Sequence, residues 1–355
     1  MKKIAVICDY KLFPERIGGM DHFFWLFDLE CKKKGNEVIW FFPNDADFSG
    51  YQNLNIVSDN EGLLTGVFLN YCKENNPGFT IVFTHFVELC TSFFLKIKKI
   101  NNPKIIAVDH NPRPLSGYPL KKKITKRIKG ILYSKHIDLF IGVSHYTVNE
   151  ILADFGSHLK NKTITIYNGV VTKDILVRNY RNDKKPSFLV ASHLRESKGI
   201  QDLIEAVNLL LNEIKNEIKI DIYGEGLYEN FLKTKVEQYQ LDSVFNFMGS
   251  KPNLKEIFCL YDYMLQPTHM ECFSLSILES LAANVPVVTT NVGGNEEAIT
   301  NNKNGYIFEA KNKNELKTLL ENLYLGNQKI ILNTRLLIEE SFSLEKMVEN
   351  YIMLI

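Results

Sequence analysis

The sequence contains two successive series of short, almost wholly apolar segments, separated by stretches with a helical spacing of apolar residues. The first series comprises residues 3–8, 37–42, 80–83, 104–108 and 139–143, and the second comprises residues 187–191, 218–223, 244–248, 263–266, 285–289 and 305–308. A strand that is apolar along its whole length is buried on both faces, as in a parallel sheet covered by helices. The sequence therefore predicts two α/β domains, joined near residues 172–186.

The stretches between these segments read as helices. The clearest predicted helices are residues 21–34, 200–212, 228–238, 254–260, 275–283, 314–325 and 344–353. Alternation of strand and helix is typical of doubly wound parallel sheets, in which ligands bind at the carboxyl ends of the strands. The residues of a functional site are therefore expected in the loops that follow the predicted strands.

Composition excludes several classes of protein. The chain has 355 residues, with 42 Lys and Arg against 41 Asp and Glu, and a net charge this small argues against a dedicated nucleic-acid binder. Its six cysteines form no C-x-x-C pair, which predicts buried thiols in a reducing cytoplasm and no structural zinc. The first apolar run ends at Asp9, too soon for a signal peptide, and no apolar run is long enough to span a membrane.

Two carboxylates flank the start of one predicted helix. Glu271 lies in the loop after the strand 263–266, and Glu279 follows eight residues later within the helix. The backbone N–H groups of Phe273, Ser274 and Leu275 would face the same place and would favour an anion. A sugar diphosphate would satisfy these features together; the alternative is a solvated loop and a surface carboxylate.

The first loops of the second series carry cations and glycines. Arg195 and Lys198 follow the strand 187–191, where they could neutralise a departing diphosphate without a metal, or form a solvated basic loop. Gly224 and Gly226 follow the next strand and would permit a ligand to approach the backbone. A plain turn explains the two glycines equally well.

In the first half of the chain, fewer residues are candidates for ligand binding or catalysis. Gly18 and Gly19 precede a predicted helix and could admit a phosphate or sugar to its N-terminus, and His110 follows the strand 104–108. A plain turn and a structural histidine are the alternatives. Asp45 and Asp47 form a D-x-D triplet beside Pro43, which we interpret as a solvated turn and not as a metal site.

Several motifs of the second half occur together in one known family. They are Glu271-x7-Glu279, Pro286-Val287-Val288-Thr289, Gly293-Gly294-x-x-Glu297, Asn304-Gly305, Gly224-x-Gly226 and Lys198-Gly199. In this order and spacing they resemble the retaining glycosyltransferases of family 4. The first half resembles the family more loosely, through Gly18-Gly19, His110, Val143-Ser144 and Asn168-Gly169.

The resemblance implies the GT-B fold, with two facing Rossmann-like domains and a cleft between them. It implies an acceptor-binding domain over residues 1–172 and a nucleotide-sugar domain over residues 173–340. We expect residues 341–355 to form a helix that packs back on the first domain. The implied activity is metal-independent, retaining transfer of a hexosyl group from a nucleotide sugar, with UDP favoured, and no cofactor. A glycan or lipid-linked acceptor, in surface polysaccharide or lipopolysaccharide synthesis, would complete the reaction.

The resemblance also assigns roles to residues. It gives catalytic roles to Glu271, His110, Lys198 and Arg195. It gives donor binding to Gly18, Gly19, Gly224, Gly226, Phe273, Ser274, Leu275 and Glu279. The family often has Arg where this chain has His193, so either His193 or Arg195 fills that role. A non-catalytic subunit that binds a sugar nucleotide, and a nucleotide-sugar epimerase, are the alternative functions.

One segment is strongly basic. Residues 120–136 hold seven Lys and Arg and no acid, with Leu120, Ile124, Ile128 and Ile131 at helical spacing. Such a helix could meet an anionic membrane surface, which would place a cytoplasmic protein peripherally at the inner face of the membrane. The alternative is an ordinary surface helix that packs on its own domain.

Overall fold

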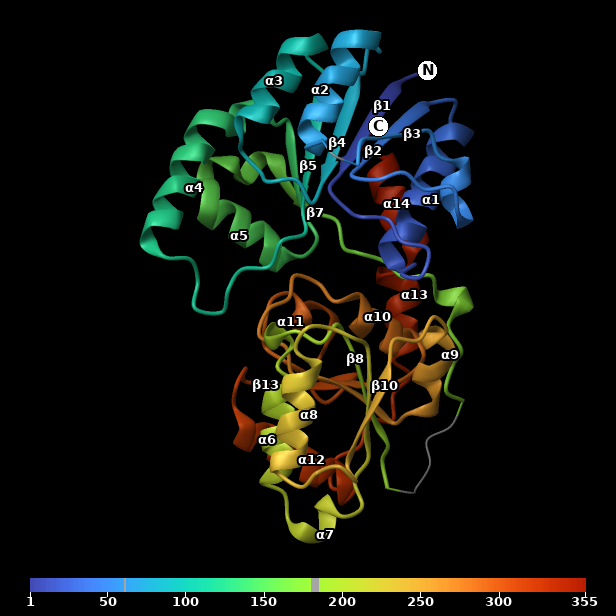
Figure 1. Cartoon of the computed structure of the whole chain (residues 1–355), viewed down its shortest axis with the longest axis vertical. Helices are drawn as coiled ribbons and strands as arrows, with labels where there is room; N and C mark the ends of the chain where they lie inside the picture. Colours follow the sequence, from blue (N-terminus) through green and yellow to red (C-terminus); the bar gives the residue numbers. More distant parts are fainter. Residues whose placement is uncertain (61, 180–184) are drawn as a thin grey trace. The chain divides into compact units, whose positions relative to one another are not determined.

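The computed structural model describes residues 1–60, 62–179 and 185–355 (Figure 1). The chain forms two compact units. One comprises Met1–Gly169 and Leu344–Ile355, and the other comprises Val170–Ser343. The polar residues at 184–186, which separate the two series of predicted strands, lie partly outside the described residues.

The first unit is built on a seven-stranded parallel sheet, and the five apolar segments of the first series form five of its strands. Its strands lie in the order β3 (Ile56–Ser58), β2 (Glu37–Phe42), β1 (Lys3–Cys8), β4 (Ile81–His85), β5 (Lys104–Asp109), β6 (Leu139–Gly142) and β7 (Thr163–Thr165). The two short strands at its edges, β3 and β7, were not predicted. The sequence predicted the fourth strand to end at residue 83, and the structure extends it to His85. Its last two residues, Thr84 and His85, are polar but buried, so hydropathy could not show that the strand continued.

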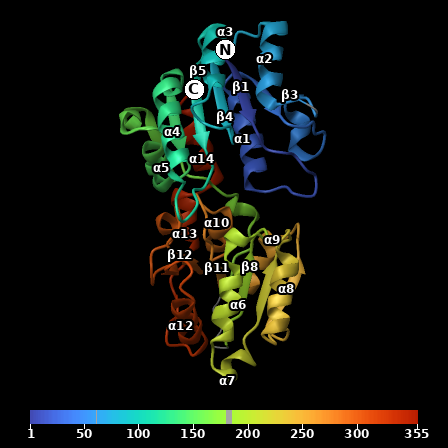
Figure 2. The ribbon, with the colours of Figure 1, turned by 60° about the vertical axis from the view of Figure 1, so that its left-hand side comes forward.

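Helices cover both faces of this sheet. They are α1 (Gly19–Lys33), α2 (Leu64–Asn75), α3 (Ser92–Asn101), α4 (Leu120–Tyr133), α5 (His145–Phe155) and α14 (Leu344–Ile352). Phe68 of α2, Phe94 of α3 and Ile151 of α5 share one apolar core with the sheet. On the other side, Phe27 of α1 lies against Phe83 of β4, with the ring centroids 5.5 Å apart. Figure 2 shows α4 beside α5.

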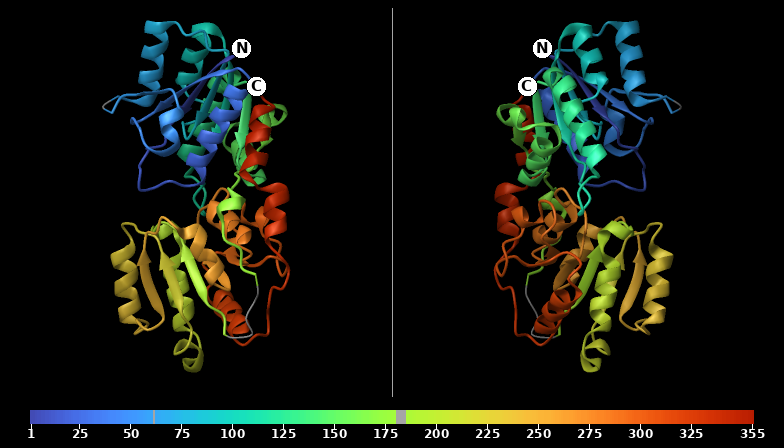
Figure 3. Two further views of the ribbon diagram at one scale, coloured as in Figure 1. Left: turned by 90° about the vertical axis from the view of Figure 1, so that its right-hand side faces the viewer. Right: turned by 90° about the vertical axis from the view of Figure 1, so that its left-hand side faces the viewer.

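The end of the chain belongs to the first unit (Figure 3). The Tyr351 ring of α14 is fully buried, with its centroid 4.9 Å from that of Phe23 and 6.1 Å from that of Phe83. Lys104, at the start of β5, donates to the Leu354 carbonyl over 2.7 Å. The last helix thus completes the layer that α1 begins.

The second unit is built on a six-stranded parallel sheet. Its strands lie in the order β10 (Phe245–Gly249), β9 (Ile220–Tyr223), β8 (Phe188–Ala191), β11 (Tyr263–Gln266), β12 (Val287–Thr290) and β13 (Gly305–Phe308). Its helices are α6 (Ile200–Asn208), α7 (Asn212–Lys215), α8 (Glu229–Gln238), α9 (Leu254–Ile257), α10 (Leu275–Ala282), α11 (Asn295–Ala298), α12 (Lys313–Tyr324) and α13 (Arg335–Ser341). Both sheets therefore confirm the prediction of two parallel α/β folds.

Two helices of this unit differ from their predicted extent. The predicted helix 200–212 ends at Asn208, and a second helix begins at Asn212. Between them Leu209 and Leu211 are exposed while Leu210 is buried, so the apolar run there marks a turn. The predicted helix 254–260 is α-helical to Ile257 and continues as a 3₁₀ turn over Phe258–Leu260.

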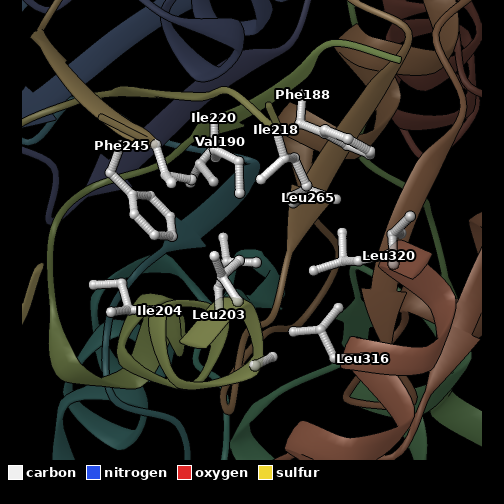
Figure 4. Packing of buried hydrophobic residues seen from close by; sticks show 14 of the residues in the cluster. Phe188, Val190, Leu203, Ile204, Ile218, Ile220, Phe245, Leu265, Leu316 and Leu320 are labelled. Carbon is white, nitrogen blue, oxygen red and sulfur yellow. The ribbon is translucent and has the colours of Figure 1, made fainter. Parts of the chain in front are cut away.

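The core of the second unit lies between its sheet and the helices on one face (Figure 4). Leu203 and Ile204 of α6 point toward Val190 of β8 and Ile220 of β9, and Leu316 of α12 joins them. All five side chains are at most 1% exposed. Their apolar surface, removed from water, stabilises the sheet whose strand ends carry the candidate site.

Leu203→Ala should lower the free energy of unfolding of the second unit by about 2–5 kcal/mol, because it removes buried atoms and leaves a cavity. Leu227→Ala is the matched control, since Leu227 is fully exposed. Urea denaturation, followed by circular dichroism, measures both. Equal effects of the two substitutions would contradict the described core.

Candidate functional site

The candidate site of the second unit forms where two loops meet at the carboxyl ends of β8 and β11. Lys198 ends the short 3₁₀ turn Glu196–Lys198 that precedes α6, and Glu271 lies in the loop between β11 and α10. Lys198 Nζ donates to Glu271 Oε2 over 2.8 Å. The structure thus joins two predicted site residues that lie 73 positions apart in the sequence.

Glycines allow these loops to approach so closely. Gly199 has φ of +69°, and a Cβ there would lie 1.7 Å from the Pro267 carbonyl oxygen. Gly293 has φ of +64°, and a Cβ there would lie 2.0 Å from the carbonyl oxygen of Glu271 itself. Only glycine fits both positions, so these residues fix the backbone on either side of the Lys198–Glu271 pair.

Gly224 and Gly226 have the same kind of role. A Cβ on Gly224 would lie 2.0 Å from the Ser192 carbonyl oxygen, and one on Gly226 would lie 2.2 Å from that of Leu194. Both glycines therefore let the loop after β9 pack against the loop after β8. This packing accounts for both residues, and their predicted contact with a donor stays a prediction.

Polar contacts also join the loops after β8 and β11. The His269 N–H donates to the Ser197 carbonyl oxygen over 2.8 Å, and His269 Nε2 lies 2.6 Å from Asp202 Oδ2. Thr290, at the end of β12, donates its hydroxyl to the Thr268 carbonyl oxygen over 2.6 Å. These supporting contacts were not predicted from the sequence, because they join groups of separate loops and of the first turn of α6.

The N-terminus of α10 follows Glu271 closely in the sequence. Ser274 Oγ caps this helix by accepting the Ile277 N–H, and Gln266 Nε2 donates to the same oxygen over 2.8 Å. Phe273 is buried, while Leu275 begins the helix. The first N–H groups of a helix have no acceptor within it, so this end carries partial positive charge. The helix therefore begins where the sequence predicted, and the binding of an anion at this end stays a prediction.

Glu279 lies in the second turn of α10 and is half-buried. Among the described residues, none forms an ion pair or a hydrogen bond with its carboxylate. Burial raises the pKa of Glu279 to about 7. An unpaired carboxyl group in such a position is a hydrogen-bond acceptor available to a ligand hydroxyl.

Arg195 lies three residues before Lys198 and is exposed. Its backbone accepts the Lys198 N–H over 2.9 Å, so the two residues share one tight turn. Within the described ranges, the Arg195 guanidinium meets no carboxylate at ion-pair distance. His193 is exposed as well, and the choice between the two for the role of the family's Arg stays open.

Gly18 and Gly19 begin α1 in the first unit. The Gly18 N–H donates to Asp21 Oδ2 over 2.8 Å, so this donor is already occupied. The same carboxylate also accepts from the Tyr10 hydroxyl over 3.2 Å and from Tyr51. A buried carboxylate in the first turn competes with any anion that approaches this helix end.

His110 follows β5 and lies 3.1 Å from a second histidine, measured from its Nε2 to His85 Nδ1. Its other face stacks on Phe86, with the ring centroids 4.2 Å apart. Burial lowers the pKa of His110 to about 4 and lowers that of His85 strongly, so both rings are neutral at neutral pH. The sequence analysis missed His85 because it ended β4 two residues early.

The D-x-D triplet is exposed. Asp45 and Asp47 lie in the loop after β2, as expected of a solvated turn. Across residues 1–60, 62–179 and 185–355, no cluster of three or more His, Cys, Asp or Glu side chains could hold a metal ion.

Comparison with known proteins identifies the family. The family of glycosyl transferases group 1 matches residues 172–335, and glycosyltransferase family 4 matches residues 17–174. The chain is 28% identical over 184 residues to an N-acetyl-alpha-D-glucosaminyl L-malate synthase of Bacillus anthracis, across 48% of this chain and 46% of the relative. It is 29% identical over 255 residues to an uncharacterized glycosyltransferase of Methanocaldococcus jannaschii, across 68% of this chain and 64% of the relative.

The fold is shared with solved structures. The structure of HepE from Anabaena in complex with UDP-glucose superposes with a TM-score of 0.77 at 15% identity, over 100% of both chains. The lipopolysaccharide outer core galactosyltransferase WaaB gives 0.73 at 18% identity, over 98% of both chains. The chain thus has the GT-B fold of two Rossmann-like sheets and belongs to the glycosyltransferases of group 1 and family 4. The curated relatives from Bacillus anthracis, Streptococcus agalactiae and Methanocaldococcus jannaschii are matched over 46%, 34% and 64% of their own lengths.

The raised pKa of Glu279 predicts how stability depends on pH. The protonated carboxyl is favoured in the fold, so its contribution is complete below the usual glutamate pKa of about 4.3 and is lost as pH rises through about 7. Glu279→Gln should therefore lose less thermal stability than the unaltered protein between pH values of about 5 and about 8. Differential scanning calorimetry measures this, with the exposed Glu213→Gln as control. Parallel curves for all three proteins would contradict the assignment.

Proposed function

We propose that the protein is a retaining glycosyltransferase that moves a hexosyl group from a nucleotide sugar, with UDP favoured, to a glycan or lipid-linked acceptor. The observation that carries this proposal is the joining of Lys198, Glu271 and the N-terminus of α10 at one edge of the second sheet. Two structures of the same fold hold UDP or UDP-glucose, and relatives of the chain are named for transfer of N-acetylglucosamine from UDP-N-acetylglucosamine.

Transfer requires the bond between the sugar and its diphosphate to break. Positive charge then develops on the sugar and negative charge on the departing diphosphate, so donors already aimed at the diphosphate lower the barrier most. The Lys198 ammonium has three protons and uses one of them on Glu271, which leaves two for phosphate oxygens. Arg195 and the first N–H groups of α10 supply further positive charge. These groups together replace a metal ion in this role.

Other residues would position the donor. The Glu279 carboxyl lacks a partner among the described side chains and would accept hydrogen bonds from ribose hydroxyls. Glu271, held by Lys198 and by the Cys272 N–H over 3.1 Å, would face the sugar. For His110 we propose a catalytic role in the same reaction. Gly18 and Gly19 would contact the donor through their backbone surface and not through the Gly18 N–H, which Asp21 occupies.

The first unit contains a cavity suited to an acceptor. It has a volume of about 490 Å³ and lies beyond the carboxyl ends of β1, β2 and β4. Asp9, Glu88 and Lys96 bring polar groups to it, and Leu64 and Phe93 bring apolar surface. A mixed lining of this kind would bind a glycan with sugar hydroxyls and apolar ring faces. We assign acceptor binding to this unit and surface polysaccharide or lipopolysaccharide synthesis as its context.

Lys198→Ala should lower turnover at least about 100-fold while leaving the fold intact, because the departing diphosphate loses its cation. The control is Lys233→Ala, which removes an exposed lysine that pairs with Glu229 in the same unit. Sugar transfer from UDP-sugars, followed by chromatography of the products, measures both. Near-normal turnover of Lys198→Ala would contradict the proposed role, and an epimerised donor without transfer would show that the protein is an epimerase.

The basic helix α4 supports a peripheral membrane site. No described helix is both long and apolar enough to cross a membrane. Leu120, Ile124, Ile128 and Ile131, which we call the apolar stripe, are nevertheless between 51% and 73% exposed. The helix does pack on its own domain, against α5, but not through this stripe. An exposed apolar stripe on a helix rich in lysine is typical of helices that lie in an anionic membrane surface.

Close packing explains why the stripe faces outward. A Cβ on Gly130 would lie 2.1 Å from the Phe155 carbonyl oxygen at the end of α5. Lys126 donates to Asp154 over 3.0 Å on the same side. α4 thus docks through its glycine and a buried ion pair, and this contact turns the apolar side chains away from the unit.

The full chain should float with phosphatidylcholine vesicles that contain phosphatidylglycerol and not with vesicles that lack it, and added salt should weaken binding. Ile124→Ser combined with Ile128→Ser should abolish flotation, because it removes apolar surface from the stripe. The control combines Leu227→Ser with Leu325→Ser, two exposed residues of the second unit. Binding to neither kind of vesicle would remove the membrane proposal.

A further inference from the structure

A second cavity of the first unit lies beside α4, and nothing above assigns a role to it. Its volume is about 490 Å³, and it is lined by residues of α4, α5 and the loop that follows β5. It shares no lining residue with the cavity at the strand ends. Its charged lining residues are Arg113, Lys123, Arg127, Glu150 and Asp154.

Ion pairs within the unit neutralise the acids of this cavity. Arg113 is only 5% exposed and contacts Asp109 over 2.7 Å and Asp154 over 2.8 Å. Asp154 also accepts from Lys126 over 3.0 Å. Glu150 lies 3.8 Å from Arg113, and burial raises its pKa. The acids therefore bring little uncompensated negative charge to the cavity.

Two cationic side chains that line the cavity remain available to bind an anion. In the part of the chain that the structure describes, neither Lys123 nor Arg127 meets a carboxylate at ion-pair distance. Arg127 donates once to the Ala153 carbonyl oxygen over 3.2 Å, which leaves four N–H donors. The Lys122 ammonium, on the first turn of α4, lies 4.0 Å from the ring centroid of Tyr118, which lines the cavity. The cavity therefore attracts an anion with several acceptor oxygens.

The position of these cations on α4 connects the cavity to the apolar stripe. At 100° per residue, Lys123 and Arg127 project between the docked face that contains Gly130 and the stripe that contains Ile124. Ile124 itself lines the cavity. On the opposite edge of the stripe, Lys129 pairs over 2.6 Å with Glu88, which lines the strand-end cavity. A ligand in this second cavity would thus contact both cationic side chains and the apolar side chain of Ile124.

We propose that this cavity binds the phosphate headgroup of an anionic membrane phospholipid, with the acyl chains of that lipid beside the apolar stripe. Lys123 and Arg127 would bind the phosphate oxygens, and Ile124 would contact the first part of the lipid chain. The inference rests on the membrane association proposed for α4 and gives it a specific lipid site. Because the acceptor is assigned to the strand-end cavity, the lipid bound here would be one of the membrane and not the substrate.

The test titrates the full chain with dihexanoyl phosphatidylglycerol, below the concentration at which this lipid forms micelles, by isothermal calorimetry. Lys123→Ala combined with Arg127→Ala should weaken binding at least about tenfold. Lys121→Ala combined with Lys135→Ala removes the same charge from the same basic segment and should weaken it by less than about threefold. Equal losses in the two variants would overturn the proposal, because diffuse surface charge would then explain binding.

Further probes separate the sources of the phosphate. Dihexanoyl phosphatidylcholine and inorganic phosphate should each bind at least about tenfold more weakly than the anionic lipid. Inorganic phosphate that binds as tightly as the lipid would overturn the proposal, because the stripe would then contribute nothing. Farnesyl diphosphate that binds more tightly than the anionic lipid would also overturn it and assign the cavity to a lipid-linked acceptor.

Two further measurements distinguish a loss of lipid binding from unfolding of the variants and from a loss of UDP binding. Circular dichroism should show that both double variants keep the fold. UDP should raise the thermal midpoint of both variants equally, because donor binding is proposed for the second unit. A chain that binds the lipid but not UDP would contradict the proposed donor site and leave this inference intact.

Discussion

The candidate site depends on backbone contacts that only glycine allows. Gly199 lies against the Pro267 carbonyl and Gly293 against that of Glu271, at distances that would exclude a Cβ. Gly224 and Gly226 do the same for the loop after β8. These contacts hold neighbouring strand-end loops at van der Waals distance, so the loops form one connected surface at the carboxyl edge of the sheet.

This packing of the loops fixes the positions of the candidate site residues. Lys198 directly precedes one of the close contacts, and Glu271 is part of another, so their ion pair is held from both sides. Gln266 and Ser274 also fix the start of α10. Donors that are already in place lose little free energy to reorganisation when charge develops on a diphosphate. The buried core beneath, around Leu203, keeps the strands that carry these loops in register.

Much of this arrangement could be predicted from the sequence, because apolar strands and their order show where the loops meet. The motif that ends in Glu279 pointed to the site, and Lys198 and Glu271 were each placed at the carboxyl end of a strand. Their ion pair was not predicted. The contact of Gly293 beneath Glu271 could not be predicted, since it depends on two loops distant in sequence. His85 was missed because buried polar residues end its strand. The outward face of α4 depends on the contact of Gly130 with Phe155, which hydrophobic periodicity does not reveal.

The central claim is that Lys198, Arg195 and the start of α10 bind the diphosphate of a nucleotide without a metal ion. Phosphorus NMR of UDP, titrated with the full chain in the presence of a chelator, tests it most directly. We expect saturable binding, with a larger change in the resonance of the β-phosphate than in that of the α-phosphate. Saturable binding that appears only after magnesium is added, or no binding at all, would contradict the account.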